Sequence, residues 1–530
     1  MSKDVNPVIL VVLDGWGLKR SGKYNAISRA KTPVLDSLRK QNSNTVLYAH
    51  DGFVGLPKGP VIGNSEVGHM HLGAGRLIEQ DLIRINDSIK SGAFFRNSVL
   101  NKAFSHSKKT KGDMHFLGLL SDGNVHSHST HLLALLKMAK QKKVKRVFIH
   151  ALLDGRDVPP KCAEKYIRRV LKEIKKLKLD AKFASIMGRF YGMDRDNRWT
   201  REFRAYTSLV TNHSDYLNKC NLSERGKHCV RKLDGEFIFF SSDPISALHE
   251  AYSRGETDEF VAPTVIEDGA IKDGDSVVFF NFRSDRAREI TRAFVDGKFN
   301  KFKRPKKLRN LYFTCLTQYD KKIKAPVVFP PSIPKHTLGS VIASQGLKQL
   351  RVAETEKYPH VTFFFNGGTE KPHVGEDRIM VNSPKVGTYD KTPAMSANKL
   401  TTALLKRLKS RNYSLVVLNF ANADMVGHTG MISPAVSACE TVDKCLGRVV
   451  KAFVKKGGSV VITADHGNAE EMSGLHQTSH TTNKVPFIIV SENKYKLKKG
   501  KSIAYVAPTI LELMGLKKPK CMNESLIVRS

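Results

Sequence analysis

The amino-acid sequence predicts an α/β fold with two domains, and three observations lead to this prediction. Short apolar runs that suit buried strands alternate along the chain with amphipathic segments that suit helices. The chain has 530 residues, which is more than a single hydrophobic core usually serves. The side chains best suited to bind metal lie at residue 14 and beyond residue 420, so we expect the middle of the chain to be inserted into the metal-binding domain.

The predicted strands are apolar runs bounded by polar or turn-forming residues. In chain order they are VILVVL, MHFLGLL, RVFIHALL, SVVFFNF, VTFFFNG, YSLVVLNF, SVVITA and VPFIIV, at residues 8–13, 114–120, 146–153, 276–282, 361–367, 413–420, 459–464 and 485–490. Continuous apolar runs are typical of parallel strands that are covered on both faces. We therefore expect parallel sheets with helices on both sides, such as an amphipathic helix over residues 162–179 whose lysines and arginines face solvent.

The boundaries of the inserted segment follow from composition. A glycine-rich stretch ends near residue 80, and the proline-containing segment APVVFPPSIP covers residues 325–334. Prolines favour an extended linker. We predict a discontinuous metal-binding domain at residues 1–79 and 335–530, an inserted substrate-binding domain at residues 80–325, and a linker at residues 326–334. The two crossings are natural hinges.

Composition excludes several classes of protein. Hydrophobic residues at 41% and aromatic residues at 8% are ordinary for a globular protein, which argues against a disordered chain. No apolar run has transmembrane length, and the first apolar stretch is too short for a secretory signal. The seven cysteines are odd in number and include no CxxC pair, so we expect a reducing, cytoplasmic location and no membrane partner.

The net charge of +37 is the unusual value in the composition. A positive charge of this size attracts phosphorylated metabolites, nucleic acid and anionic membranes, without selecting among them. Basic runs at residues 301–309 and 493–501 are not interleaved with aromatic side chains at a repeating spacing, and the chain has only two tryptophans, so a platform for base stacking is not expected. We predict no specific nucleic-acid partner and only weak binding that salt removes.

Five candidate metal ligands follow three of the apolar runs: Asp14, Asp424, His428, Asp465 and His466. In open α/β sheets, chemistry gathers at the carboxyl ends of parallel strands. Carboxylates combined with imidazoles suit Mn²⁺ or Zn²⁺ better than Ca²⁺, and five ligands are too many for one ion that keeps an open position. Each residue alone reads more naturally as a turn aspartate or a surface histidine, but the set together favours a two-metal site.

Ser65 is the leading candidate nucleophile. It lies in GPVIGNSEVGHMHLGAGR, where glycines permit sharp turns and close backbone approach. A divalent metal can stabilise a serine alkoxide, and a metal-bound serine can accept and return a phosphoryl group. Alone, the segment is more typical of a tight loop, and it lacks the P-loop pattern, but beside a two-metal set Ser65 is favoured as the nucleophile.

Four motifs in the middle of the chain place arginine, histidine or aspartate just after an apolar run. They are LLSDGNVHSH, HALLDGRDVPP, MGRFYGMDRDNRW and FFNFRSDRAR. Arginine clusters bind phosphate and carboxylate through parallel hydrogen bonds, so the motifs indicate a small dianion that carries a second acid. The alternative, a surface ion pair, suits a single arginine better than four motifs at four strand ends.

Together with DGWG, GNSEVGH, AETEKYPHVTFFFNGG, DMVGHTG, TADHGNAEEM and HTTNKVPF, these motifs resemble the 2,3-bisphosphoglycerate-independent phosphoglycerate mutases, a family of the alkaline phosphatase superfamily. The resemblance covers nearly the whole chain. It implies an alkaline-phosphatase-like domain split in sequence by an inserted phosphotransferase domain. It further implies an isomerase of glycolysis and gluconeogenesis that interconverts 3-phosphoglycerate and 2-phosphoglycerate through a phosphoserine. We expect two divalent metal ions, Mn²⁺ above others, no requirement for 2,3-bisphosphoglycerate, and a monomer.

The resemblance also implies roles for individual residues. One metal would be held by Asp424, His428 and His480, and the other by Asp14, Ser65, Asp465 and His466. The substrate would contact His126, Arg156, Asp157, Arg189, Arg195, Arg283, Arg286 and Lys357. Ser65 would be the nucleophile, Asp157 would exchange a proton with the glycerate hydroxyls, and Lys357 would stabilise the phosphoryl group in transfer.

Some features depart from the family pattern, and two other functions stay open. The stretch from Asn212 to about Phe240 is longer than expected, and Ala504 and Tyr505 stand where an acidic residue is expected. A metal-dependent phosphatase or another phosphomutase of the superfamily would share the metal ligands but would not need the arginine and aspartate motifs. A basic nucleic-acid-binding protein that retains the fold is the alternative outside enzymes.

Overall fold

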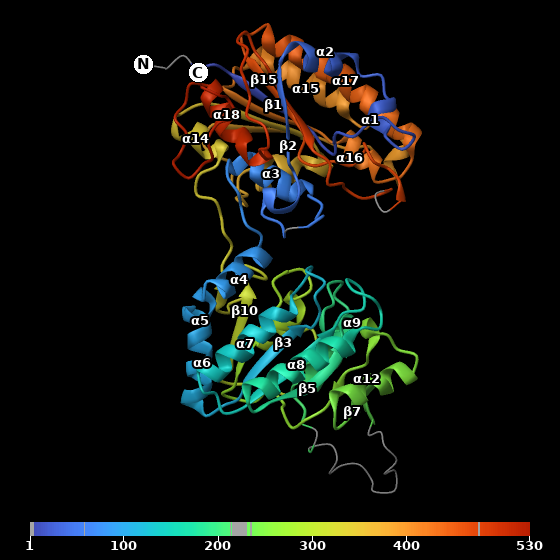
Figure 1. The fold of residues 1–530 in the computed structure, drawn as a ribbon, viewed down its shortest axis with the longest axis vertical. Helices are drawn as coiled ribbons and strands as arrows, with labels where there is room; N and C mark the ends of the chain where they lie inside the picture. The colour runs from blue at the N-terminus through green and yellow to red at the C-terminus, as the bar shows by residue number, and fades with distance from the viewer. Residues whose placement is uncertain are drawn as a thin grey trace. The chain divides into compact units, whose positions relative to one another are not determined.

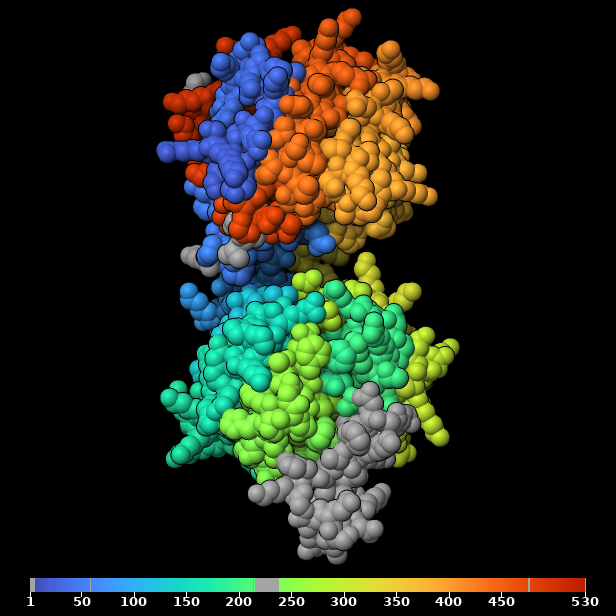
Figure 2. All heavy atoms as spheres, turned by 90° about the vertical axis from the view of Figure 1, so that its right-hand side faces the viewer, coloured from blue at the N-terminus to red at the C-terminus, as the bar shows by residue number. Residues whose placement is uncertain are grey.

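The computed structural model describes residues 5–57, 59–212, 214, 230–233, 236–474 and 477–529. The chain divides into two compact units, of which unit 1 comprises Met1–Gln80 with Ser332–Ser530 and unit 2 comprises Asp81–Pro331. Unit 1 therefore contains both ends of the chain, drawn in dark blue and in orange to red, while unit 2 runs from light blue through green to yellow (Figure 2). Each unit has its own sheet flanked by helices, which confirms the predicted α/β class (Figure 1).

The sheet of unit 1 has seven strands in the order β13-β12-β14-β1-β15-β16-β2. In chain order these are β1 Val8–Leu13, β2 Ser43–Leu47, β12 Gln349–Glu354, β13 Glu376–Val381, β14 Leu415–Phe420, β15 Ser459–Thr463 and β16 Val485–Val490. The first five strands of the sheet order are mutually parallel, and β16 is antiparallel to both of its neighbours. Strands β1, β14, β15 and β16 are buried along their whole length, as continuous apolar runs require.

Several helical segments surround this sheet. They are α1 Ala26–Arg29, α2 Pro33–Gln41, η1 Asp51–Val54, α3 Ser65–Ala74, α14 Leu338–Ser344, η4 Thr355–Lys357, η5 His360–Phe364, η6 Tyr389–Lys391, α15 Ala397–Ser410, α16 Asn422–Gly427, α17 Ile432–Val454, η8 Ile503–Tyr505 and α18 Val506–Leu513.

The sheet of unit 2 has nine strands in the order β11-β10-β9-β3-β4-β5-β8-β7-β6. In chain order these are β3 Met114–Leu119, β4 Val147–Leu153, β5 Ala181–Gly188, β6 Val230–Leu233, β7 Glu236–Phe240, β8 Thr264–Val265, β9 Ser276–Phe279, β10 Tyr312–Thr317 and β11 Val327–Phe329. Strands β11 through β5 in this order are parallel. Their carboxyl ends therefore meet at one edge of the sheet.

Helices cover both faces of this second sheet. They are α4 Asp81–Lys90, α5 Ala93–Arg96, α6 Ser98–Thr110, α7 Ser129–Gln141, α8 Ala163–Leu177, α9 Arg189–Gly192, α10 Trp199–Leu209, α12 Pro244–Ser253, η3 Asp258–Phe260 and α13 Arg288–Val295. Successive strand residues point to opposite faces of the sheet, so the core has two layers. Phe116 belongs to the layer with α6, α7 and α8, and Leu117 belongs to the layer with α10 and α13.

Two strand predictions were wrong in part. Residues 361–367 form the π-helix η5 and its end rather than a strand, with the Phe365 amide bonded to the His360 carbonyl at 3.0 Å. Val361, Thr362 and Phe365 are buried, a helical spacing that a short apolar run does not reveal. The run at Val485–Val490 is a strand, but it is antiparallel to β15 because loops and turns, rather than a crossover helix, occupy the described residues between them.

The predicted amphipathic helix is confirmed as α8, with Ile167 and Val170 buried. The polar stretch at residues 213–235 that the sequence marks as a surface excursion lies largely outside the described residues. Within the described part of the chain, every helix is too short or too polar to cross a lipid bilayer.

Candidate active site

Four neighbouring parallel strands of unit 1 deliver candidate site residues to one edge of its sheet. In the order β12-β14-β1-β15, the segments after their carboxyl ends carry Lys357, Asp424, Asp14 and Asp465. These residues are remote in sequence, and the parallel sheet brings them together because adjacent strands lie about 4.8 Å apart. All four side chains are buried.

Helix α3 places Ser65 against this group. Asn64 is the N-cap, and its side chain accepts a hydrogen bond from the Val67 amide at 2.9 Å, so Ser65 is the first residue of the helix. Amide groups point outward at a helix N-terminus, and the helix dipole favours negative charge there. A phosphate carried by Ser65 would lie in this favourable field.

The Ser65 hydroxyl has three polar neighbours. The Lys357 ammonium donates to Ser65 Oγ at 2.7 Å, and it also donates to Asp14 and Asp424 at 2.6 Å each. Ser65 Oγ lies 2.9 Å from His466 Nε2 and 3.3 Å from Asp14 Oδ1. Burial lowers the pKa of His466 to about 4, so its imidazole is neutral and can accept the serine proton or bind a metal.

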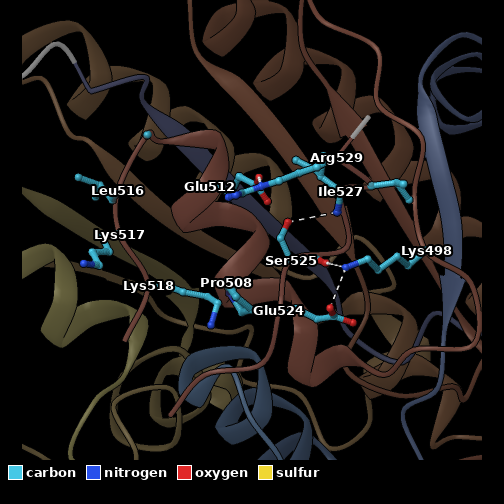
Figure 3. Close-up of a pocket in the computed structure, with 12 residues that line it drawn as sticks. Lys498, Pro508, Glu512, Leu516, Lys517, Lys518, Glu524, Ser525, Ile527 and Arg529 are labelled. Carbon is cyan, nitrogen blue, oxygen red and sulfur yellow. Dashed lines mark hydrogen bonds and ion pairs between the residues drawn. The ribbon is translucent and has the colours of Figure 1, made fainter. Parts of the chain in front are cut away.

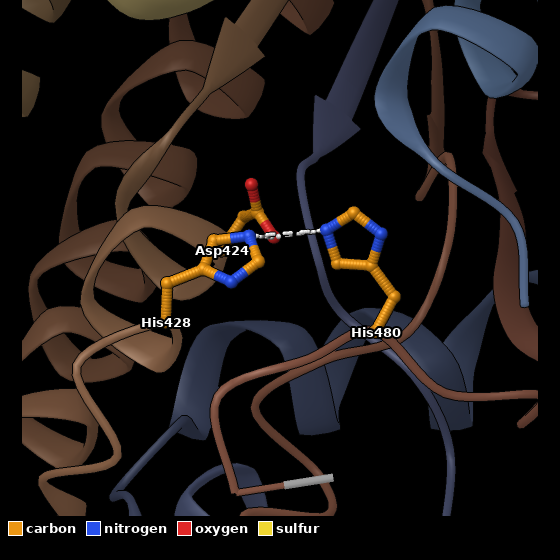
Figure 4. A group of neighbouring side chains, drawn as sticks. All are labelled: Asp424, His428 and His480. Carbon is orange, nitrogen blue, oxygen red and sulfur yellow. Dashed lines mark hydrogen bonds and ion pairs between the residues drawn. The ribbon is translucent and has the colours of Figure 1, made fainter. Parts of the chain in front are cut away.

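Asp424, His428 and His480 converge on one point (Figure 4). The two imidazole Nε2 atoms lie 3.1 Å apart, and both are within 3.3 Å of Asp424 Oδ1. His428 Nδ1 lies 2.8 Å from the Thr478 carbonyl and His480 Nδ1 lies 2.9 Å from the Gly63 carbonyl, which places the proton on each Nδ1. The Nε2 lone pairs therefore face each other, an arrangement that a bound cation stabilises.

The second group of candidate ligands consists of Asp14, Asp465 and His466, beside Ser65. His466 Nε2 lies 3.7 Å from Asp14 Oδ1 and 3.5 Å from Asp465 Oδ2. Burial raises the pKa of Asp14 to about 7, and repulsion from Asp465 and Asp424 contributes. Three carboxylates this close and this deeply buried require more positive charge than the Lys357 ammonium supplies, so the donor set fits divalent cations.

His69 is a residue of this site that sequence reasoning missed. Its Nδ1 lies 2.9 Å from the Ser65 carbonyl and 3.2 Å from Asp465 Oδ2, and its Nε2 lies 3.0 Å from the Asn419 amide nitrogen. Asn419 also donates to Asp14 at 2.7 Å. His69 lies four residues after Ser65 in GNSEVGH, which is one helical turn. This spacing places the two side chains on the same face of a helix and could have identified His69 from the sequence.

The candidate substrate residues of unit 2 gather in the same way at the carboxyl edge of the second sheet. In the order β9-β3-β4-β5, the segments after the strands carry Arg283, His126, Asp157 and Arg189. Arg189 is buried and donates to Asp157 at 2.5 Å and to Asp154 at 2.8 Å. His126 Nε2 lies 4.0 Å from Asp157 Oδ2.

The remaining arginines of unit 2 surround this centre. Arg195 and Arg283 both pair with Asp285, at 3.3 and 3.1 Å, and Arg156 pairs with Glu259 at 3.3 Å. Burial lowers the pKa of Arg286, with repulsion from Arg189 and Arg195. Burial also lowers the pKa of His126 to about 3, so its imidazole is neutral. This excess of guanidinium groups suits a multiply charged anion.

The structure thus places the predicted residues in two groups, one in each unit. Unit 1 brings together Asp14, Ser65, Lys357, Asp424, His428, Asp465, His466 and His480, and unit 2 brings together His126, Arg156, Asp157, Arg189, Arg195, Arg283 and Arg286. Asp154 and Asp285 pair with the unit 2 arginines and were not predicted, although both lie inside motifs that the sequence marks.

A cavity of about 830 Å³ in unit 1 includes none of these residues. It lies beside α18 and the carboxyl-terminal segment, where Lys498 pairs with Glu524 at 3.0 Å and Arg529 with Glu512 at 3.1 Å (Figure 3). These charged side chains pair with one another, so they do not converge on a common point as the polar groups around Ser65 do.

The fold and site define an enzyme of the alkaline phosphatase superfamily, with a serine beside candidate metal ligands at the carboxyl edge of a mostly parallel sheet. A model of the BPG-independent PGAM N-terminus matches residues 85–321, and a type I phosphodiesterase / nucleotide pyrophosphatase model matches residues 319–515.

Full-length relatives identify the family within that superfamily. The chain is 48% identical over 535 residues to the 2,3-bisphosphoglycerate-independent phosphoglycerate mutase of Moorella thermoacetica, covering 99% of this chain and 98% of the relative. It is 48% identical to mutase 1 of Methanosarcina acetivorans over 541 residues, covering all of both chains. The crystal structure of Leishmania mexicana phosphoglycerate mutase at low cobalt concentration has 30% identity and a TM-score of 0.66, covering 99% of this chain and 98% of that one. The chain belongs to the 2,3-bisphosphoglycerate-independent phosphoglycerate mutases.

Proposed function

We propose that this chain interconverts 3-phosphoglycerate and 2-phosphoglycerate through a phosphoserine at Ser65. The observation that carries the proposal is the environment of the Ser65 hydroxyl. It lies at a helix N-terminus, 2.9 Å from a neutral imidazole and 2.7 Å from a buried ammonium. Such surroundings activate a hydroxyl and favour the dianion that it would carry.

Two divalent ions belong to the proposal, and Mn²⁺ fits the mixture of carboxylate and imidazole donors. Asp424, His428 and His480 would hold one ion, and Asp14, Ser65, Asp465 and His466 would hold the other. Bound there, the ions would stabilise the serine alkoxide and neutralise charge on the phosphoryl group. The pairing of each His Nδ1 with a carbonyl supports the first set, because it leaves Nε2 available as a ligand.

Lys357 is proposed to stabilise the phosphoryl group during transfer. Burial opposes its charge, but Asp14 and Asp424 outweigh burial and raise the pKa of Lys357 above its usual range, so it is protonated. A fixed positive charge that needs no reorganisation is the most effective form of electrostatic catalysis. Lys357 contacts Ser65 Oγ directly, so it is placed to follow the negative charge between serine and phosphate.

The residues of unit 2 are proposed to hold the glycerate while its phosphate resides on Ser65. Arg156, Arg189, Arg195, Arg283 and Arg286 supply the charge that retains a small carboxylate. Asp157 would take a proton from one glycerate hydroxyl and return it to the other, and its contact with Arg189 fixes its position. The reaction requires both groups of residues to act on the same substrate molecule, with water excluded so that the phosphoserine is not hydrolysed.

A metal-dependent phosphatase is the second candidate, because the metal and nucleophile groups alone would serve it. The arginine and aspartate group of unit 2 favours the mutase. A coupled assay separates the two functions: purified protein with Mn²⁺ and 3-phosphoglycerate, read by enolase for 2-phosphoglycerate and in parallel for free phosphate. We expect 2-phosphoglycerate with little phosphate and no need for 2,3-bisphosphoglycerate. Phosphate release without 2-phosphoglycerate would reject the mutase.

We further propose a monomer in a reducing, cytoplasmic compartment. Five cysteines in the described residues are unpaired, namely Cys162, Cys315, Cys439, Cys445 and Cys521, which supports the compartment. Light scattering of the purified enzyme measures the oligomeric state.

A further inference from the structure

The edge of the unit 2 sheet opposite to the candidate substrate residues is lined with lysines. Helices α6, α7 and α8 run back from the carboxyl edge, so their last turns and the loops that follow reach the amino-terminal edge of the sheet. All three helices pack on the same face (Figure 1). The loop before β10 contains the basic run at residues 301–309 and ends at this edge as well.

The loops are continuous with one another in strand order. The Gly274 amide donates to the Arg309 carbonyl at 3.1 Å, and the Thr110 hydroxyl donates to the Gly274 carbonyl at 2.7 Å. On the other side, the Lys140 ammonium donates to the Lys178 carbonyl at 3.0 Å. The lysines therefore form one stripe across β10, β9, β3, β4 and β5, about 19 Å long at the usual strand spacing.

We define the lysine stripe as the exposed lysines in the last turns of these helices and in the loops that follow, with two from the end of the basic run: Lys108, Lys109, Lys111, Lys137, Lys140, Lys143, Lys145, Lys172, Lys175, Lys176, Lys178, Lys306 and Lys307. The edge also carries acids, but Asp113 pairs with Arg146 at 2.8 Å and Asp273 with Arg309 at 3.3 Å. Among the residues that the structure describes, none of the stripe lysines forms an ion pair. Asp275 is buried at this edge and pairs with His115 at 3.0 Å, and Glu173, Asp180 and Asp296 are further acids nearby in sequence, so the stripe keeps a local excess of positive charge.

We propose that the lysine stripe binds double-stranded nucleic acid through its phosphates, without reading sequence. A duplex carries one charge per about 1.7 Å of its axis, so a stripe of about 19 Å faces a dense row of phosphates. Lysine is a compact point charge that suits nonspecific phosphate contact, whereas bidentate recognition uses arginine. This surface lies at the edge of the unit 2 sheet opposite to the candidate substrate residues, and the proposal is independent of the mutase activity.

Two observations favour a duplex over other polyanions. The half-buried aromatic side chains near the stripe pack against neighbours, Phe302 on Phe203 and Tyr312 on His106, rather than offering a platform for the bases of a single strand. It also contains no exposed large apolar side chain to insert into a membrane. Phe260 is the exposed large apolar residue among the described residues of unit 2, and it contacts Phe190, which lies in α9 just after the carboxyl end of β5. Stable membrane association generally adds apolar insertion or a lipid chain to electrostatic attraction.

The test compares two variants with the same loss of charge. The stripe variant is Lys143→Ala, Lys145→Ala, Lys175→Ala and Lys176→Ala, and the matched control is Lys494→Ala, Lys496→Ala, Lys499→Ala and Lys517→Ala, at exposed positions of unit 1. Fluorescence anisotropy measures binding to a labelled duplex of about 20 base pairs at several salt concentrations. Mutase activity and thermal unfolding of both variants report that the fold is kept.

We expect the stripe variant to bind the duplex at least about tenfold more weakly, with a shallower dependence on salt, and the control to lose less than about twofold. Equal losses in the two variants would assign binding to the overall charge and overturn the proposal. Stronger binding to a single strand of the same length would also overturn it. So would stronger binding to phosphatidylserine vesicles at equal phosphate concentration, since it would assign the stripe to a lipid surface.

Discussion

At the level of single residues, the proposed chemistry depends on charges that are buried together. Asp14, Asp424 and Asp465 are inaccessible to solvent, and Lys357 is the nearest positive group. Burial opposes ionisation of Asp424, but the Lys357 ammonium holds its pKa well below the usual range. A cluster of buried carboxylates destabilises the fold when its charge is not compensated. Such clusters are therefore typical of functional sites.

Replacing Lys357 tests its proposed role. We expect Lys357→Met to lower kcat by about 100-fold or more, because a preorganised charge beside the transferring group is lost. Lys357→Arg, which keeps the charge but changes its shape, should recover part of the rate. Rapid-quench measurement of the first turnover gives the rate of the chemical step, and metal content measured on the same samples reports whether the ions are still bound. A first turnover at the wild-type rate in Lys357→Met would contradict the assignment.

At the scale of elements, helix α3 matters because it packs very closely against the strand ends. A Cβ atom at Gly68 would lie 2.7 Å from the Asp465 carbonyl oxygen, and one at Gly73 would lie 1.9 Å from the Phe365 carbonyl oxygen. The absent side chains let α3 approach β15 and the π-helix η5. This approach is what places Ser65 beside His466.

Gly68→Ala is therefore expected to harm the enzyme although alanine favours helices. Helix propensity alone would stabilise the variant by about 1 kcal/mol, but overpacking against Asp465 should cost about 1–3 kcal/mol and move Ser65. Gly22→Ala, where a Cβ meets no atom within 4 Å, is the control and should be close to neutral. Chemical unfolding and kcat measured on both variants check this. A Gly68→Ala enzyme that is more stable and fully active would show that the close packing is not required.

The pH dependence of stability follows from His71, which fastens the end of α3. Its Nδ1 lies 2.7 Å from the Val67 carbonyl, and the Ile78 amide donates to its Nε2 at 3.0 Å. Burial lowers the pKa of His71 to about 4 in the folded state. The unfolded chain then binds more protons between pH 6.5 and about 4, so the free energy of unfolding falls as the pH drops through this range and is unaffected above it.

His71 contributes up to about 3 kcal/mol to this loss, at about 1.4 kcal/mol per pH unit. His71→Gln should be less stable at neutral pH and should lose less stability on acidification. Denaturant unfolding of the metal-free protein at a series of pH values measures both effects. Identical slopes for the variant and the wild type would contradict the neutral state of His71.

The elements differ in how far the sequence could predict them. Long apolar runs such as Val8–Leu13 and Leu415–Phe420 are strands because burial on both faces requires continuous apolar residues. The run at residues 361–367 is also apolar but forms a π-helix and its end. This segment packs closely on α3, a tertiary contact that local propensity does not reveal. Ligand candidates were visible because they follow strands directly. His69 was visible only through its spacing of one helical turn from Ser65, and Asn419 was not visible, because its partners Asp14 and His69 are remote in sequence.

At the scale of the whole molecule, the chain joins two α/β units with different chemistry. Unit 1 holds the candidate nucleophile and metal ligands, and unit 2 holds the arginine and aspartate group. Moving a phosphoryl group between two hydroxyls requires both a transfer site and a site that retains the glycerate. The two groups of residues therefore agree with membership of the mutase family.

Removal of metal tests the contribution of unit 1. Dialysis against a chelator should abolish activity and lower the unfolding temperature, since ligand carboxylates are left without compensating charge. Readdition of Mn²⁺ should restore activity, with about two ions bound per chain by elemental analysis. Asp424→Ala should bind about one ion fewer. Full activity in the chelator-treated protein, at a metal content near zero, would contradict the two-metal proposal.

The proposed mechanism requires the phosphoryl group to pass through Ser65, and trapping the phosphoenzyme tests this step. The enzyme is mixed with Mn²⁺ and 3-phosphoglycerate, quenched in acid within milliseconds, and mapped by mass spectrometry of its peptides, with Ser65→Ala treated in parallel. We predict phosphate on Ser65 that forms as fast as turnover, and neither phosphoenzyme nor mutase activity in Ser65→Ala. Phosphate on a different residue, or wild-type turnover by Ser65→Ala, would contradict the mechanism.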